Sequence, residues 1–173
     1  MNKTLNFLFL GLAWLSMQPL PAQSLKLNES GYFDGGGVNV MVFNNPYHSF
    51  FYDEKRSGID IIHRGVLTAS NGCVRLQNTP EQWDLVPETV SHKVDVDRQT
   101  VSVVVDYPDY GFQPEMRVSP RGKGFAVEVW LSQPVPKFLE GKAGFNLEFL
   151  PSAYWQRSFL IDGRPDYFPR YPG

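Results

Sequence analysis

The chain has 173 residues, of which 42% are hydrophobic and 14% aromatic, and its formal net charge is −2. This length suits one domain, and the apolar content is sufficient for a core. The 16 Lys and Arg residues are scattered along the chain, which argues against a nucleic-acid partner because phosphate binding needs a concentrated basic face.

The N-terminal residues have the pattern of an export signal. Lys3 precedes an apolar run over residues 7–15, and small or turn-forming residues follow up to Ala22. The run is shorter than the ~20 residues of a membrane-spanning helix. We therefore predict a signal peptide over residues 1–22, cleavage near Ala22, no membrane span, and a periplasmic or extracellular protein. Residues 23–173 are predicted to form a single domain.

Short β-branched or alternating segments follow, separated by turns rich in Gly, Pro, Asn and Asp. The predicted strands are 37–43, 48–52, 59–63, two short strands within 66–77, 92–96, 100–105, 112–118, 125–131 and 144–150. Roughly ten strands at regular spacing predict an all-β fold, as a β-sandwich or barrel. The polar, glycine-rich segment 25–37 is predicted to be a loop, and one helical turn is predicted at 79–84.

Three details of this pattern are specific enough to test. Asn71-Gly72 predicts a tight hairpin turn between the two strands of 66–77. The internal proline of 112–118 favours an edge strand. In 144–150 the alternation predicts a core strand, with the inward-facing residues being Phe145, Leu147 and Phe149 and the outward-facing ones Asn146 and Glu148.

The number of strands favours a supersandwich of the galactose-mutarotase type. The alternative is an immunoglobulin-like sandwich, but its about seven strands in about 100 residues would leave much of this chain unassigned.

Residues of catalytic type give no convincing constellation. The carboxylate pairs all fall in predicted turns, where acidic residues are common for local reasons; they are Asp53 with Glu54, Glu81 with Asp84, and Asp106 with Asp109. The three histidines are widely spaced, so we predict no metal ligand and no cofactor. The single cysteine, Cys73, is predicted to be a buried and inert thiol.

Aromatic residues give the strongest binding signal, because flat rings pack against the C–H faces of sugars. The candidate aromatic residues are Trp83, Tyr107, Tyr110, Trp130, Tyr154 and Trp155, and of these Trp83, Trp130, Tyr154 and Trp155 are the predicted carbohydrate-binding residues. Trp130 is in phase with Ala126 and Glu128, so it is expected to face outward. The alternative, which we favour over a sugar platform, is that Tyr154, Trp155 and Phe159 close the end of the sandwich or cover a neighbouring domain.

Three stretches of the chain carry a family resemblance: Thr-Pro-Glu-Gln-Trp-Asp at 79–84, Gly-Ile-Asp-Ile-Ile-His-Arg-Gly at 58–65, and the run at 139–154 that contains Gly-Phe-Asn-Leu-Glu-Phe-Leu-Pro. Together with the tail at 162–172, they resemble the N-terminal β-sandwich region of exported bacterial glycoside hydrolases of family nine, the cellulase-like enzymes. The resemblance covers essentially the whole of residues 23–173.

The resemblance implies that an (α/α)-barrel catalytic domain follows such a region, with an Asp-Ala-Gly-Asp motif and a later Glu. No position of this chain matches either, so no catalytic residue carries over, and the C-terminus is expected to be truncated. The leading hypothesis is a non-catalytic accessory module, or a fragment, that packs on a glycosidase catalytic domain and contacts polysaccharide. The alternatives are a free-standing carbohydrate-binding protein and a small mutarotase- or lyase-like enzyme with His63 as its base.

Overall fold

The computed structural model describes residues 24–45, 57–76 and 85–168 and is all-β, with antiparallel sheets. This confirms the all-β part of the predicted fold class. The predicted strand 48–52, the helical turn 79–84 and the signal segment 1–22 lie outside the described residues. No helix in the described part of the chain is long and apolar enough to cross a membrane.

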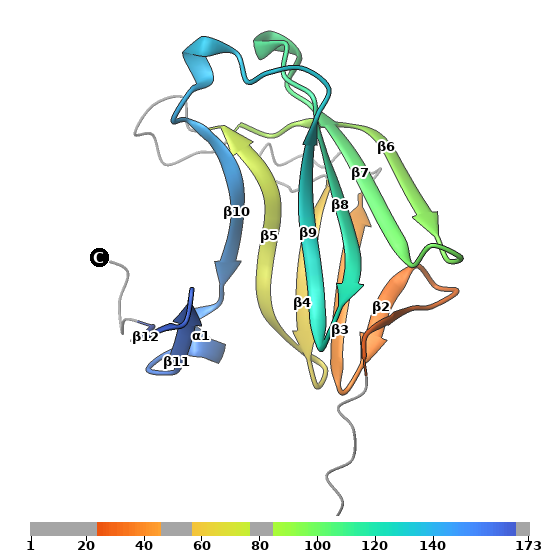
Figure 1. The fold of residues 1–173 in the computed structure, drawn as a ribbon, viewed down its shortest axis with the longest axis vertical. Coiled ribbons are helices and arrows are strands. Elements are labelled where there is room, and N and C mark those ends of the chain that lie inside the picture. Colours follow the sequence, from red (N-terminus) through yellow and green to blue (C-terminus); the bar gives the residue numbers. More distant parts are fainter. Residues whose placement is uncertain (1–23, 46–56, 77–84, 169–173) are drawn as a thin grey trace, which may run out of the picture.

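Two sheets make up most of the described chain (Figure 1). The larger sheet contains, in spatial order, β1 (Lys26–Leu27), β2 (Tyr32–Gly35), β3 (Val38–Asn44), β4 (Ser57–His63), β5 (Val66–Leu76) and β10 (Ala143–Phe149). The smaller sheet is ordered β6 (Glu88–Asp95), β7 (Thr100–Asp106), β8 (Pro114–Arg121) and β9 (Gly124–Leu131). A separate hairpin, β11 (Ser158–Ile161) with β12 (Arg164–Tyr167), follows the helical turn α1 (Pro151–Tyr154). Two 3₁₀ turns are η1 (Pro108–Tyr110) and η2 (Lys137–Leu139).

The core lies between the two sheets, where β7 packs on β3 and β8 packs on β5. Strand β7 shows why the sequence folds this way, since its burial alternates with a period of two and places three valines fully inside. These three are Val101, Val103 and Val105. They belong to one buried cluster with apolar residues of the larger sheet, which include Phe33, Val40, Ile59, Val74 and Leu76.

The predicted hairpin at Asn71-Gly72 is wrong. Residues Val66–Leu76 form one continuous strand, and Asn71 adopts a positive φ of 65° within it. The pairing register with β10 shifts at this point, so Asn71 is the extra residue of a β-bulge. Asn tolerates the left-handed backbone region in a bulge as well as in a turn, and here its side-chain amide donates a hydrogen bond to Glu148 of β10.

The predicted edge position of 112–118 is also wrong, because β8 lies between β7 and β9. Pro114 is the first residue of the strand, and its cross-strand partner is Leu131 of β9, while the pairing with β7 begins only at Glu115. The missing N–H of the proline therefore removes no hydrogen bond from the β7 side.

The segment predicted to be a loop at 25–37 contains β1 and β2. Gly36 and Gly37 both have positive φ, 60° and 79°, and connect β2 to β3 directly through the pair Gly35↔Val38. Consecutive positive φ angles are what a two-residue hairpin of the mirror-image type requires. The glycine run that was interpreted as a loop is therefore the tight turn of the β2–β3 hairpin.

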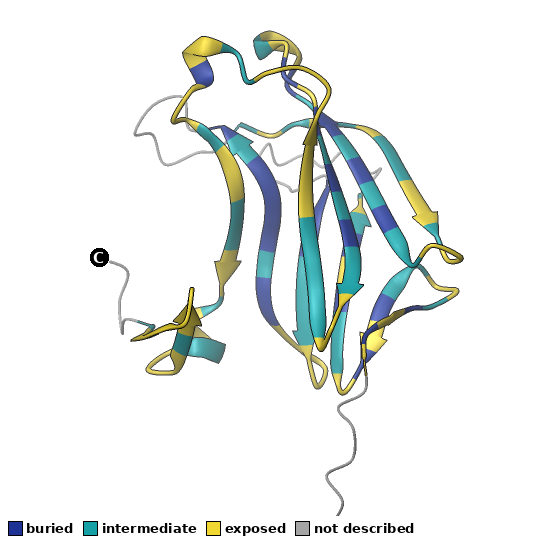
Figure 2. Cartoon of the chain, in the orientation of Figure 1, coloured by how far each residue is buried: buried dark blue, intermediate teal, exposed yellow. Residues whose placement is uncertain are grey.

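Strand β10 is present as predicted but is less covered than expected. Phe145 pairs with buried Val74, and Phe149 with buried Ala69, so both phenylalanines lie on the core side of the sheet. Their exposed fractions are nevertheless 39% and 44%. Figures 1 and 2 show the arrangement of the described strands: β10 lies at the edge of the larger sheet, and β9, at the edge of the smaller sheet, does not extend over it.

Candidate binding surfaces

The predicted carbohydrate-binding aromatics occupy different parts of the molecule. Trp130 lies on β9 in the smaller sheet, whereas Tyr154 ends α1 and Trp155 follows it, beyond β10. Trp83 lies outside the described residues. The structure therefore does not assemble Trp130, Tyr154 and Trp155 into one site.

Tyr154 is engaged in packing within the chain. Its ring meets Phe149 edge to face at 5.1 Å between centroids and lies 5.1 Å from Phe168, which in turn lies 4.7 Å from Phe159. These four rings attach the α1–β11–β12 unit to the end of β10. This arrangement agrees with the alternative expectation that Tyr154 closes the end of the sheet structure. Trp155 stays 47% exposed.

Trp130 faces outward, as its phase predicted, and is 51% exposed. Its cross-strand partner is Glu115, and the next outward pair is Arg117 with Glu128. These four residues therefore form a two-by-two block on the outer face of β8 and β9, because paired residues of antiparallel strands point to the same side. We call this block the Trp130 platform.

The Trp130 platform is held together by four polar and aromatic contacts. Arg117 donates two hydrogen bonds to the Glu115 carboxylate, at 2.8 and 2.9 Å, and its guanidinium carbon lies 4.3 Å from the centroid of the Trp130 ring. The indole N–H of Trp130 donates to Glu128 at 3.3 Å. Both the orientation of the indole and that of the guanidinium are thus fixed before any ligand arrives.

Charge on the Trp130 platform is partly compensated. The hydrogen bonds from Arg117 lower the pKa of Glu115, and the same contact raises the pKa of Arg117. Ser102 and Lys93, on the neighbouring strands β7 and β6, also lower the pKa of Glu115. The alternation of residues 125–131 predicted the outward orientation of Trp130 but gave no indication of Glu115 and Arg117; the outward phase of these two residues around buried Met116 was the signal that could have shown them.

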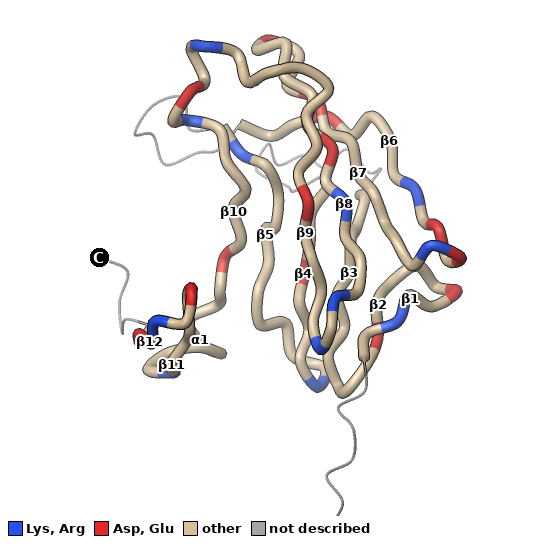
Figure 3. Tube along the Cα trace, viewed as in Figure 1, with Lys and Arg blue, Asp and Glu red and all other residues tan. Residues whose placement is uncertain are grey.

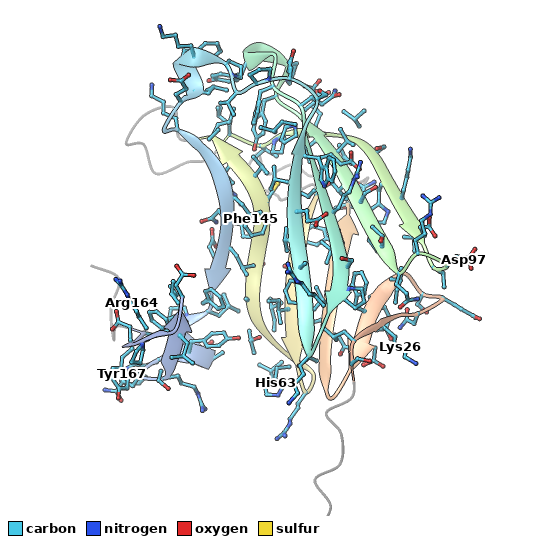
Figure 4. All side chains as sticks on the ribbon, viewed as in Figure 1. Lys26, His63, Asp97, Phe145, Arg164 and Tyr167 are labelled. Atoms are coloured by element: carbon cyan, nitrogen blue, oxygen red, sulfur yellow. The ribbon has the colours of Figure 1, made fainter. Side chains whose placement is uncertain are left out.

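A second surface lies along the uncovered strands. We call it the β9–β10 edge and define it by four exposed apolar residues, Val129, Leu131, Phe145 and Phe149. Val129 pairs with buried Met116, and Leu131 with buried Pro114, so they have the same core-facing phase as Phe145 and Phe149 (Phe145 is labelled in Figure 4). All four have the orientation of core residues but remain in contact with solvent.

The described residues do not bring the candidate catalytic side chains together into one site. Asp106 ends β7 and Asp109 lies in η1, while the other two predicted carboxylate pairs fall outside the described ranges. His63 is exposed at the end of β4 (Figure 4). Across the described ranges, no group of three or more His, Cys, Asp or Glu residues is placed to hold a metal ion.

Cys73 is buried, and burial raises the pKa of its thiol to about 11. This confirms that Cys73 is buried, and a thiol with so high a pKa is expected to be a poor nucleophile at neutral pH. Figure 3 shows that both basic and acidic residues occur along the described chain.

Comparison with known proteins found no matching family model, no matching curated protein and no matching solved structure. Function is therefore argued from the two surfaces themselves.

Proposed function

We propose that this protein is a non-catalytic, exported β-sandwich module that docks onto the catalytic domain of a glycan-degrading enzyme through the β9–β10 edge. The observation that carries the proposal is the exposure of Val129, Leu131, Phe145 and Phe149 in a core-facing orientation. The four side chains lie on β9 and β10, each at the edge of its sheet among the described strands, and exposed apolar side chains at such positions are typical of surfaces that another protein covers.

The composition and the pairing of β10 also favour docking at this surface. β10 contains a single charged residue, Glu148, and neither lysine nor proline, although such residues commonly protect an exposed edge strand from pairing. Among the described residues, β10 pairs on one side only, with β5. A partner domain that covers the edge would bury the two phenylalanines and the unpaired backbone of β10 together.

The identity of the partner rests on the sequence resemblance to the N-terminal region of family-nine glycoside hydrolases. We further propose the supersandwich type for the fold. A six-stranded sheet opposite a four-stranded one exceeds the about seven strands of an immunoglobulin-like domain, which supports this choice.

Calorimetric titration tests the proposal, with the (α/α)-barrel domain of a bacterial family-nine enzyme as the probe. We expect binding at micromolar concentrations that the double variant Phe145→Ser, Leu131→Ser abolishes, because exposed apolar anchors dominate such interfaces. Trp130→Ala, on the outer face of the same strand β9, is the matched control and should bind like the native chain. The absence of binding at high micromolar concentration would refute the docking proposal, and so would binding that the edge variant leaves unchanged.

The enzyme alternative is tested separately by measuring release of reducing ends from soluble β-glucans. We expect none with the native chain. If the native chain released reducing ends and the His63→Ala variant did not, the protein would instead be a small enzyme that uses His63.

A further inference from the structure

The Trp130 platform calls for an explanation beyond docking at the β9–β10 edge. Trp130 points away from the core, on the opposite face of β9 from Val129 and Leu131. A tryptophan carries a large apolar surface, and half of this one is in water although the neighbouring residues on that face are polar. The residue is therefore poorly explained as part of the core or of the β9–β10 edge.

The contacts around Trp130 hold the ring in one orientation. The indole is fixed on one side by stacking with Arg117 and at its N–H by Glu128, and Arg117 is itself fixed by two hydrogen bonds to Glu115. Fixing a side chain before binding reduces the conformational entropy lost when a ligand arrives. The remaining exposed indole surface is thus a rigid, flat apolar area bordered by carboxylate oxygens and guanidinium N–H groups.

This combination matches the chemistry of a pyranose ring. A sugar whose hydroxyl groups are all equatorial presents axial C–H bonds on its flat faces, which pack against an aromatic ring. Its hydroxyl groups lie around the rim, where Glu115 and Glu128 can accept hydrogen bonds and Arg117 can donate them. A polyanionic ligand fits less well, because the Trp130 platform contains two carboxylates and one guanidinium.

We propose that the Trp130 platform is a binding site for a neutral β-linked glucan, in which one glucose ring stacks on the exposed indole of Trp130 and its hydroxyls bond to Glu115, Arg117 and Glu128. The choice of a polysaccharide as ligand rests in part on the proposed function. The site itself is separate from the β9–β10 edge, because it uses the outer face of the sheet.

Affinity electrophoresis in native gels that contain hydroxyethylcellulose tests this site. We expect the native chain to be retarded, Trp130→Ala to lose about tenfold or more in affinity, and Trp130→Phe to retain part of the retardation because it keeps an aromatic face. Tyr167→Ala is the matched control, because Tyr167 is an aromatic residue that is 70% exposed on β12 and is not among the candidate carbohydrate-binding residues; it should migrate like the native chain. A gel with polygalacturonate should cause no retardation.

Several outcomes would overturn the proposal. They are the absence of retardation of the native chain in hydroxyethylcellulose, equal loss in Trp130→Ala and Tyr167→Ala, and stronger retardation in polygalacturonate than in the neutral gel. Far-ultraviolet circular dichroism and the thermal midpoint of each variant show whether a loss of retardation comes from unfolding. If Trp130→Ala is unfolded, the comparison of Trp130→Phe with the native chain decides the test. A chain that binds hydroxyethylcellulose but not the (α/α)-barrel domain would retain this site and refute the docking proposal alone.

Discussion

The phenolic hydroxyl of Tyr107 donates a hydrogen bond of 2.8 Å to the carbonyl oxygen of Val74, and both residues are buried. Tyr107 directly follows β7 of the smaller sheet, and Val74 lies in β5 of the larger one. The bond therefore joins the two sheets through the core, in surroundings where a polar atom without a partner is costly.

Tyr107→Phe removes this hydroxyl and should lower the free energy of unfolding by about 1–3 kcal/mol, because the carbonyl of Val74 stays buried and loses this hydrogen-bond donor. Urea denaturation followed by circular dichroism measures the change. Tyr167→Phe, at a tyrosine that is mostly exposed on β12, is the control and should have no measurable effect. Equal stability of Tyr107→Phe and the native chain would show that the bond does not join the sheets.

Gly72→Ala should destabilise the bulge region by about 1–3 kcal/mol, since a methyl group there has no room. A Cβ at this position would lie 2.7 Å from the Cβ of Ile59 and 3.2 Å from Cδ1 of Leu147. Gly144→Ala on β10 is the matched control, because its Cβ would meet nothing within 4 Å; it should change stability by less than about 0.5 kcal/mol. The same denaturation series compares the two, and similar midpoints for both variants would contradict the close packing at Gly72.

Cys73 should resist thiol reagents in the folded protein. With a thiol pKa of about 11 in place of 9.0, the thiolate fraction at pH 8 falls by about 100-fold, and burial reduces access further. The rate of reaction with Ellman's reagent in the folded and the guanidinium-unfolded chain measures this. Rapid stoichiometric labelling of the folded chain would contradict the burial.

Glu115→Gln should change how stability depends on pH. The folded-state pKa of Glu115 is lowered by Arg117, so the ion pair stabilises the fold fully above the ordinary value of 4.5, and its contribution is lost as the pH falls through the lower folded value. The native chain should therefore be more stable than Glu115→Gln at pH 7, and the difference should shrink below pH 4.5.

The thermal midpoints of both proteins between neutral pH and pH 3 test this, and added salt should also reduce the difference at pH 7. In an Arg117→Met background the same Glu115→Gln change should show a weaker pH dependence, because the main partner charge is gone while Ser102 and Lys93 still lower the pKa of Glu115. A difference between native and Glu115→Gln that stays constant with pH would refute the interaction.

How far the sequence predicts this structure depends on what each pattern encodes. Alternation with a period of two identified 100–105 and 125–131 as strands and placed Trp130 outward, because one face of each strand is buried. The same alternation gave Phe145 the correct side of β10, but not its exposure, since coverage depends on how far the smaller sheet extends. Asn71-Gly72 was misread because positive φ serves a bulge as well as a hairpin.

The partners of Trp130 could not be read from the sequence because they depend on the register between β8 and β9. That register is set by the turn from Arg121 to Gly124, where Gly122 has a φ of 60°. A shift by one residue would place Trp130 opposite a different side chain. The position of the β9–β10 edge likewise depends on the order of strands in the two sheets.

The most direct test of the docking proposal is a map of backbone amide shifts by nuclear magnetic resonance, recorded as the (α/α)-barrel domain of a family-nine enzyme is added to the labelled chain. We predict that the largest changes fall on residues 129–131 of β9 and 143–149 of β10, with little change at Glu115 and Arg117. Changes centred on the Trp130 platform or on other strands, or a spectrum that does not change at all, would contradict docking through the β9–β10 edge.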